Sequence, residues 1–351
     1  MNNQENKLRA YTFNKPERIP VRYSISIASW YNYDTRDLEK LVLKHKSLFP
    51  NYIEGSIDKN NLPFLPYHIK DVEYTDSWGC VWKTGQFGIT GAVVKHSLDN
   101  WDKLKTFIPP DPNHRNGWLE IDWNNIEKNI SLQKEKNEFV SVGLRHGYLF
   151  LTLSYIRGFE NLIFDMHDEV PELEKLIDVL ESFNSKVVDK FLSLNPDMVD
   201  FPEDLGSQKS LLLSPKMFKQ YIKPVYRRLM KPVKDSKKLV HMHVDGYVMD
   251  IIDDLIECGV DVINPQDLVN GIDDIQKHIK GRMAINLDID RQNVTVFGSK
   301  KDIDDLIKEE VMKLGSSKGG LSLVYGLYPG TPLKNAEAVM AAMEKYSLYY
   351  S

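Results

Sequence analysis

The chain has 351 residues, of which 42% are hydrophobic and 27% charged, and its formal net charge is −5. This is the composition of an ordinary globular protein, and the slight acidity argues against nucleic acid or an anionic membrane as a partner. The two cysteines form no CxxC pair, and no apolar run approaches the ~18 residues that span a bilayer, so we expect a soluble, cytoplasmic protein.

Residues 1 to about 115 contain few regular helical patterns, several aromatic side chains and the turn-rich stretch FIPPDPNHRNGW. We expect this region to fold as a cap onto the rest of a single domain covering residues 1–351, because no flexible linker separates the two parts. Its aromatic side chains are candidates to line a substrate pocket, with core packing as the alternative role: Trp30, Tyr31, Trp78 and Trp82.

Residues 116–351 carry the main alternation of short apolar runs with longer amphipathic ones. The pattern predicts strands near 138–144, 197–202, 237–243, 260–265, 282–287 and 320–326. It predicts helices near 172–194, 215–235, 249–259, 272–279, 302–315 and 332–347. Such an α/β alternation gives parallel strands covered by helices, either in a closed (β/α)8 TIM-type barrel or in a doubly wound sheet. No GxGxxG follows a strand, so we expect no nucleotide cofactor.

Polar residues gather where the predicted strands end, which is where β/α barrels carry their catalytic groups. In chain order they are Arg145, His146, Glu203, Asp204, Gln208, His241, His243, Asp245, Gln266, Asp267, Asp288, Asp290 and Tyr325.

The stretch KKLVHMHVDGYV places His241, His243 and Asp245 at every second position of a strand, and therefore on one face of it. Equal-parity neighbours are about 6.6 Å apart at Cα, so one ion can reach only two of the three side chains. We take His243 and Asp245 as the pair and add Glu203 from the neighbouring strand, which makes a nitrogen and oxygen set suited to zinc with one position open. The alternative is a strand histidine that is simply hydrogen-bonded.

Several longer segments together resemble the uroporphyrinogen decarboxylase superfamily, which includes the true decarboxylase and the corrinoid-dependent methyltransferases. The resemblance extends over nearly the whole chain and implies a distorted (β/α)8 barrel. It rests on NKPERIPV, DSWGCVW, SLDNWDKLKTFIPPDP, EDLGSQKSLLLSPKMFKQYIKPVYRRL, HVDGYVMDIIDDLIECGVDVINPQ, NLDIDRQNV and GTPLKNAEAVMAAM.

Two departures from family patterns narrow the activity that the resemblance implies. The decarboxylases carry an arginine-rich RQAGRYM segment and a catalytic aspartate, whereas the corresponding VRYSISIASWYNYDT has the single arginine Arg22. The thiol methyltransferases bind zinc through HxCG and a second cysteine. Here His243 matches the histidine, but Asp245 stands at the first cysteine position and Tyr325 or Gly326 near the second.

The resemblance therefore implies a methyltransferase that moves a methyl group from a small ether, alcohol or amine to the Co(I) of a corrinoid-binding partner protein. Zinc on Glu203, His243 and Asp245 would activate the leaving group, with Tyr325, His146 or Asp204 as proton donor. Five residues are expected to bind the substrate: Arg145, Gln266, Trp30, Tyr31 and Trp78.

Two other functions stay open. One is a decarboxylase of a small or tetrapyrrole carboxylic acid, in which Asp288 or Asp204 stabilises a protonated intermediate. The other is a non-catalytic binding barrel. A monomer and a homodimer are both compatible with the sequence.

Overall fold

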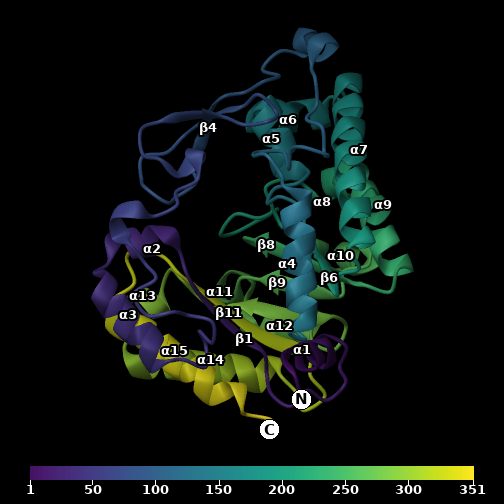
Figure 1. Cartoon of the computed structure of the whole chain (residues 1–351). Coiled ribbons are helices and arrows are strands. Elements are labelled where there is room, and N and C mark those ends of the chain that lie inside the picture. The colour runs from purple at the N-terminus through teal and green to yellow at the C-terminus, as the bar shows by residue number, and fades with distance from the viewer.

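The computed structural model describes residues 1–351 and contains a curled sheet of parallel strands in the order β1-β11-β10-β9-β8-β6-β5 (Figure 1). The short strand β7 also pairs with β8: β6 meets its first half and β7 its second half, so that β6 and β7 act as one interrupted strand. No hydrogen bonds join β1 to β5 at the two ends of this order. The expected α/β TIM-type barrel is confirmed, as a curled sheet that is not hydrogen-bonded all the way round.

The strands of this sheet are β1 (Val21–Ile25), β5 (Ser141–Gly143), β6 (Met198–Asp200), β7 (Glu203–Asp204), β8 (Leu239–Asp245), β9 (Val262–Pro265), β10 (Ala284–Asp288) and β11 (Leu321–Leu327). The α-helices are α1 (Asn3–Tyr11), α2 (Ile27–Asn32), α3 (Thr35–Lys44), α4 (Trp123–Glu135), α5 (Phe150–Arg157), α6 (Phe159–His167), α7 (Pro171–Ser193), α8 (Pro215–Met217), α9 (Lys223–Asp235), α10 (Ile252–Cys258), α11 (Asp267–Asn270), α12 (Ile272–His278), α13 (Val294–Phe297), α14 (Lys300–Leu314) and α15 (Leu333–Ser347). None of these helices is both long enough and apolar enough to cross a membrane.

Strand β8 shows how the alternation of the sequence positions the site. Val240, Met242 and Val244 are fully buried in the main hydrophobic cluster. His241 and His243 instead make their hydrogen bonds to polar side chains of neighbouring strands. Because successive side chains on a strand point to opposite faces, the apolar set packs against the helices and the polar set faces the barrel interior.

The amino ends of the strands are closed by apolar packing around α1. A small buried cluster gathers there from α1, from the segment before β5 and from the first residues of β6, β9 and β10: Tyr11, Phe139, Met198, Val262 and Ala284. The Tyr11 ring meets the Phe139 ring edge-on at 5.8 Å. This packing narrows the amino end of the barrel, and we expect ligands to enter from the carboxyl ends of the strands.

The N-terminal region contributes a second, antiparallel sheet in the order β2-β3-β4, formed by Glu73–Thr75, Val81–Lys83 and Ala92–Lys95. Figure 1 shows β4 above the carboxyl ends of the barrel strands. The turn between β2 and β3 is held by Asp76, which accepts hydrogen bonds from the Trp82 indole at 2.7 Å and from the Cys80 amide at 2.9 Å. One cluster of 71 buried residues includes members of this region and of the barrel, among them Leu38, Trp82 and Leu323.

Candidate active site

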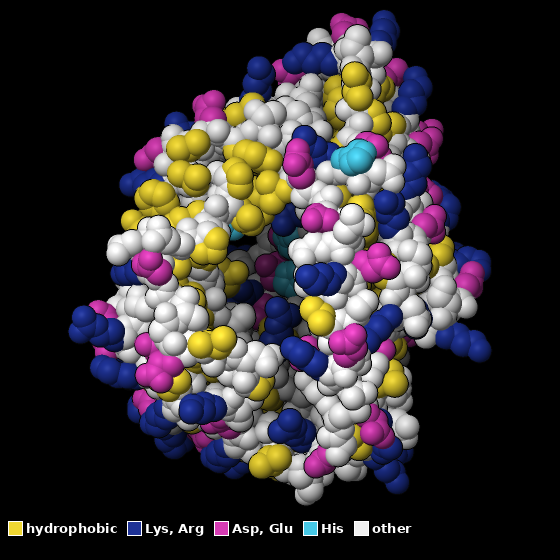
Figure 2. All heavy atoms as spheres, viewed as in Figure 1, with side chains coloured by type: hydrophobic (Ala, Val, Ile, Leu, Met, Phe, Trp, Pro, Cys, Tyr) yellow, Lys and Arg dark blue, Asp and Glu magenta, His cyan; other side chains and the backbone are white.

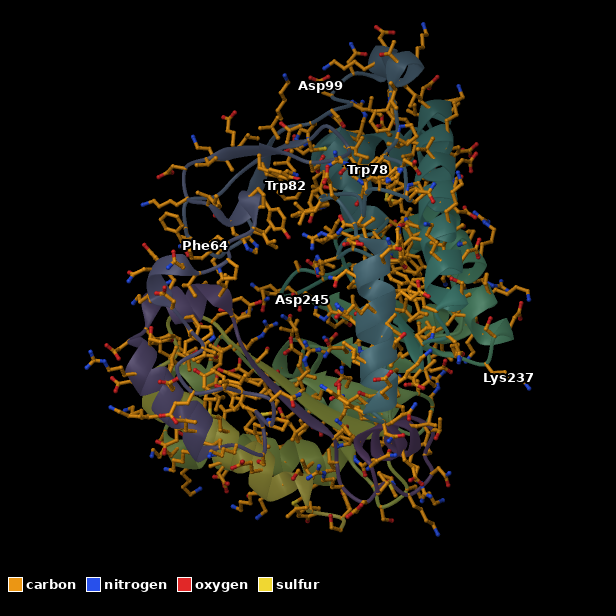
Figure 3. The ribbon with its side chains drawn as sticks, viewed as in Figure 1. Phe64, Trp78, Trp82, Asp99, Lys237 and Asp245 are labelled. Atoms are coloured by element: carbon orange, nitrogen blue, oxygen red, sulfur yellow. The ribbon has the colours of Figure 1, made fainter.

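A cavity of about 850 Å³ opens at the carboxyl ends of the barrel strands. Its walls come from β1, from the segments that end β5, β7, β8, β9, β10 and β11, and from the N-terminal sheet. Figure 2 shows the opening, with histidine, acidic and basic side chains inside and hydrophobic side chains gathered beside it. Trp82 of β3 and Asp245 of β8 both line this space, Trp82 from above in the view of Figure 3.

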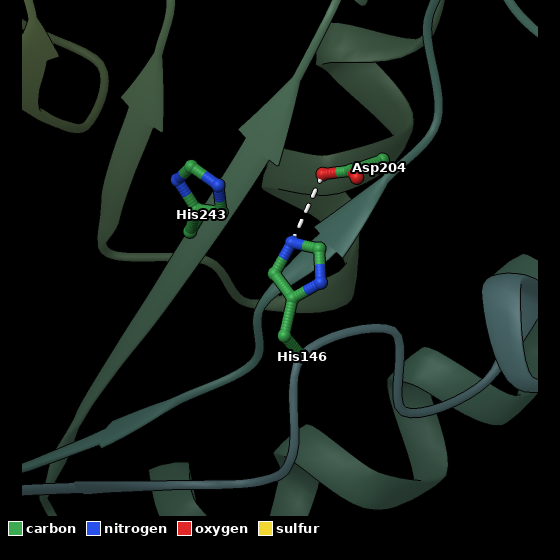
Figure 4. A group of neighbouring side chains, drawn as sticks. All are labelled: His146, Asp204 and His243. Carbon is green, nitrogen blue, oxygen red and sulfur yellow. Dashed lines mark hydrogen bonds and ion pairs between the residues drawn. The ribbon is translucent and has the colours of Figure 1, made fainter. Parts of the chain in front are cut away.

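Three potential metal ligands meet on the wall of this cavity: His146, Asp204 and His243 (Figure 4). One ligand atom from each lies within 4.8 Å of the others, and His146 Nε2 is 3.1 Å from Asp204 Oδ1. Two imidazole nitrogens and one carboxylate oxygen form a donor set that suits zinc and leaves a fourth position open. We call these three residues the ligand group.

The His243 ring is held by the strand beside it. Its Nδ1–H donates to Asn264 Oδ1 at 2.7 Å, and the Asn264 amide group donates to the backbone carbonyl of Asn286, which fixes the amide's orientation. Nε2 is thereby left free to face the ligand group, in the arrangement that usually orients a histidine ligand. Burial opposes protonation of His243, but its contacts with Asp245 and Asn264 outweigh that effect and raise the pKa to about 9.

Asp245 and Asp288 lie beside the ligand group and share one arginine. Arg291 is 2.6 Å from Asp288 and 3.8 Å from Asp245, whose Oδ1 is also 3.7 Å from His243 Nε2. The Asp245 Oδ1 atom is buried and has no hydrogen-bond partner. Burial raises the pKa of Asp288 to about 6, although Arg291 acts against the rise. Asp288 therefore holds a proton more readily than an exposed aspartate does.

Glu203 points away from the cavity, which corrects the prediction that it is a metal ligand. It pairs in register with Val244, on the outward face of β8, whereas Asp204 pairs with Asp245 on the inward face. Its fully buried carboxylate accepts the backbone N–H groups of the residues that begin α5, Leu149, Phe150 and Leu151, at 3.1, 2.9 and 3.1 Å. Burial raises the pKa of Glu203 to about 7 against these hydrogen bonds.

Tyr325 also faces outward, which corrects the prediction that it donates a proton to the substrate. Its ring packs on Tyr23 at 5.1 Å, and its fully buried hydroxyl donates to Thr295 at 3.3 Å. The neighbouring positions on β11, Val324 and Gly326, line the cavity instead.

Four further residues that were expected to bind substrate lie outside the cavity. Trp30 stacks on Tyr52 at 6.2 Å, and Trp78 packs against Phe107 and Phe183 at 6.2 and 5.1 Å. Tyr31 contacts Phe64 and Phe87. Gln266 lines a separate cavity of about 160 Å³ and accepts the Gly246 N–H at 3.1 Å. Of the expected substrate contacts, only Arg145 lines the main cavity, together with Trp82.

His241 lies below the ligand group, inside the barrel. Its Nδ1–H donates to Asp200 at 2.5 Å, and Asn286 donates to its Nε2 at 3.1 Å, so both ring nitrogens are occupied. Other residues that the sequence did not point to also line the main cavity: His96, Trp118, Tyr155, Asn264 and Arg291. The alternation of inward and outward side chains along β9 would have predicted that Asn264 faces the barrel interior. His96 comes from the N-terminal region and Trp118 from the loop before α4, and nothing in the sequence shows which side chains of these segments meet the barrel.

This protein is a parallel β/α barrel with a polar cavity at the carboxyl ends of its strands. Residues 90–346 match the uroporphyrinogen decarboxylase (URO-D) family, and the chain belongs to that family, as the resemblance implied.

Similar relatives include the methylcobamide:CoM methyltransferases MtaA of Methanosarcina barkeri strain Fusaro and of Methanosarcina barkeri, which are 23% and 22% identical over 173 residues. The match covers 49% of this chain and 49% of each relative, so it spans about half of their length. Among solved structures, a methyltransferase from Methanosarcina mazei is similar over 99% of both chains, with a TM-score of 0.64 and 17% identity, which shows a shared fold.

Proposed function

We propose that this protein is a methyltransferase that moves a methyl group from a small methylated ether, alcohol or amine to the Co(I) of a corrinoid-binding partner protein. The relatives named above are methyltransferases, and they supply the reaction class. The observation that carries the proposal is the ligand group of His146, Asp204 and His243 on the wall of a cavity of about 850 Å³. A cavity of this size admits a small donor and leaves space for a second reactant above it.

The ligand group fits zinc, and His146, Asp204 and His243 are the residues that would hold it. When bound, the metal supplies a Lewis acid that makes a poor oxygen or nitrogen leaving group easier to displace. Asn264 orients His243 through Nδ1. Without metal, Asp245 stabilises the protonated ring from 3.7 Å, and zinc would take the place of the Nε2 proton. With its raised pKa, Asp288 is the group best suited to hold a proton for the departing atom.

The ligands are nitrogen and oxygen atoms, which favours an oxygen or nitrogen donor over a thiol. Cys80 and Cys258 are both buried, and neither lines the cavity. Burial raises the pKa of each thiol to about 12, so neither offers a thiolate near neutral pH. Apolar side chains at the mouth, among them Phe159 and Tyr328, are 42% and 45% exposed and suit contact with a partner protein.

Metal analysis combined with a methyl-transfer assay tests this function. We expect about one zinc per chain in the purified protein, and loss of it in His243→Ala and Asp204→Asn. Methyl transfer to free Co(I) cobalamin, measured by its absorbance with a panel of methyl ethers and amines, should fall at least about a hundredfold in these variants.

The control is His241→Ala, which removes a histidine from the same strand but outside the ligand group. Its zinc content should stay near that of the unsubstituted protein, and its activity should fall less. Zinc retained in His243→Ala, or an equal loss of zinc in His241→Ala, would contradict the assignment of the ligands.

A decarboxylase is the second candidate, because Asp288 combines burial, a pKa of about 6 and a place on the cavity wall. The decarboxylase function predicts that the protein releases carbon dioxide from a carboxylic acid and needs no metal for this. A protein that binds no zinc but loses carbon dioxide release on Asp288→Asn would favour this function over methyl transfer.

A further inference from the structure

Arg145 is a largely enclosed cation that has no counterion. Its guanidinium carbon lies 3.7 Å from the centre of the Trp118 ring and 5.3 Å from that of Tyr67. Its Nε atom is buried and has no hydrogen-bond partner, and no carboxylate lies within ion-pair distance of the side chain. A buried charge without a partner is costly, so the fold supports this side chain at the expense of stability.

The aspartates of the cavity already have basic partners. The lining includes three aspartates, of which Asp204 pairs with His146 while Asp245 and Asp288 share Arg291. Arg145 is thus left as an unbalanced positive charge on the same wall. Arg22 is also unpaired, but it is exposed within the barrel and lines a second cavity beneath the main one. The Trp118 ring fixes the plane of Arg145, and Arg22 has no such support.

A carboxylate is the ligand that this arrangement fits. The planar guanidinium presents N–H groups in a fork that matches the two oxygens of a carboxylate. Trp82 and Tyr155, which meet edge-on at 4.6 Å, form an aromatic wall of the same cavity. Arg145 and His146 are consecutive in the chain, so one short segment after β5 carries both the free cation and a member of the ligand group.

Building on the proposed function, we propose that the methyl donor is a methylated carboxylic acid with a flat or aromatic body. Arg145 binds its carboxylate, and the ligand group receives the end that bears the methyl group. The class includes methoxybenzoates, which carry a carboxylate and a methyl ether at opposite ends of a ring. Methyl transfer from such a donor breaks the bond between methyl carbon and oxygen, and the methyl carbon becomes bonded to the Co(I) supplied by the partner protein. The freed oxygen takes up one proton, for which Asp288 is the proposed source, to leave a hydroxybenzoate.

Calorimetric titration of the full chain tests this inference without any catalysis. We expect 4-methoxybenzoate to bind at least tenfold more tightly than 4-methoxybenzyl alcohol, which has a similar shape but no charge. Arg145→Gln should remove this preference, and Arg145→Lys should keep part of it because it retains the charge but loses the fork. Arg115→Gln is the matched control, since Arg115 is 43% exposed and pairs with Glu120 at 3.1 Å on the loop that leads to Trp118.

Equal binding of the acid and the alcohol by the unsubstituted protein would overturn the inference, whatever the folding of the variants. Undiminished acid binding by Arg145→Gln would also overturn it. The product 4-hydroxybenzoate, which has no methyl ether, separates this inference from the proposed function. Binding of it through Arg145 without methyl transfer from any donor would support the carboxylate site and count against the methyltransferase. Methyl transfer from neutral donors, by a protein that binds no acid, would support the methyltransferase and count against the carboxylate site.

Discussion

Glu203 illustrates a buried carboxylate that supports the backbone instead of the chemistry. Glu203→Ala would leave three N–H groups in the first turn of α5 without acceptors. We expect it to lower the free energy of unfolding by about 3 kcal/mol, because unsatisfied buried donors cost about 1–3 kcal/mol each and partial relaxation recovers some of this. Urea unfolding measures the change, and Glu203→Gln, which keeps one carbonyl oxygen, should cost less.

Zinc content provides the check on this assignment of Glu203. The folded Glu203→Gln variant should bind as much zinc as the unsubstituted protein, because the ligand group does not include this residue. A folded variant without zinc would mean that Glu203 reaches the metal after all.

Individual site residues were predictable where strand parity was applied. The alternation of polar and apolar residues on β8 predicts that His243 faces the barrel interior, and the structure has it there. Glu203 and Tyr325 have suitable side chains for a site, but their register on the strands turns them away from the cavity. In the parallel pairs, Asp204 lies opposite Asp245, and Tyr325 lies opposite the outward-facing Tyr23. A shift of one residue along a strand reverses the face, so register decides which of two adjacent groups enters the cavity.

At the scale of elements, the β/α alternation predicted parallel strands covered by helices, because each amphipathic helix must cover a parallel strand. The alternation left a closed barrel and a doubly wound sheet open, and the family resemblance favoured the barrel. The N-terminal elements were not predictable in the same way. Strands β3 and β4 are short, and their place above the barrel depends on contacts such as the ring of Trp82 on that of Tyr155, 73 positions away in the chain. Local patterns carry no information about such distant pairs, so the aromatic wall of the cavity was only partly found.

Helix α14 contains a buried glutamate, Glu310, whose ionisation should make the stability of the fold depend on pH. Glu310 is fully buried, its carboxyl oxygens have no hydrogen-bond partner, and burial followed by repulsion from Asp267 raises its pKa well above the usual value. Below about pH 4.5 Glu310 is protonated in both the folded and the unfolded protein, and the folded state keeps its full stability. As pH rises from there toward the folded pKa, the unfolded state ionises first, so the free energy of unfolding falls. Glu310→Gln should therefore stabilise the protein by about 1–3 kcal/mol at pH 8.

Thermal unfolding at pH 5 and pH 8 tests this pH dependence. The increase in stability caused by Glu310→Gln should be clearly larger at pH 8, because keeping the buried glutamate protonated costs more free energy there. The neighbouring Glu309 side chain is 48% exposed and pairs with Lys313 at 2.7 Å, so Glu309→Gln should change stability by less than about 0.5 kcal/mol at either pH. The same gain at both values of pH would rule out titration of Glu310 as the cause.

For the whole molecule, we expect the N-terminal region and the barrel to unfold as one unit. All six tryptophans lie within residues 30–123, whereas the long helices α7, α9, α14 and α15 lie beyond them. Four of the six lie in the N-terminal region, so tryptophan fluorescence reports mainly on that region, whereas far-UV circular dichroism is dominated by the helices of the barrel. Because one hydrophobic cluster joins the two parts, their urea transitions should coincide. Leu38→Ala in α3, where Leu38 is fully buried, should move both transitions together by about 2–4 kcal/mol. If that substitution shifted the fluorescence transition alone, the cap would be an independent folding unit.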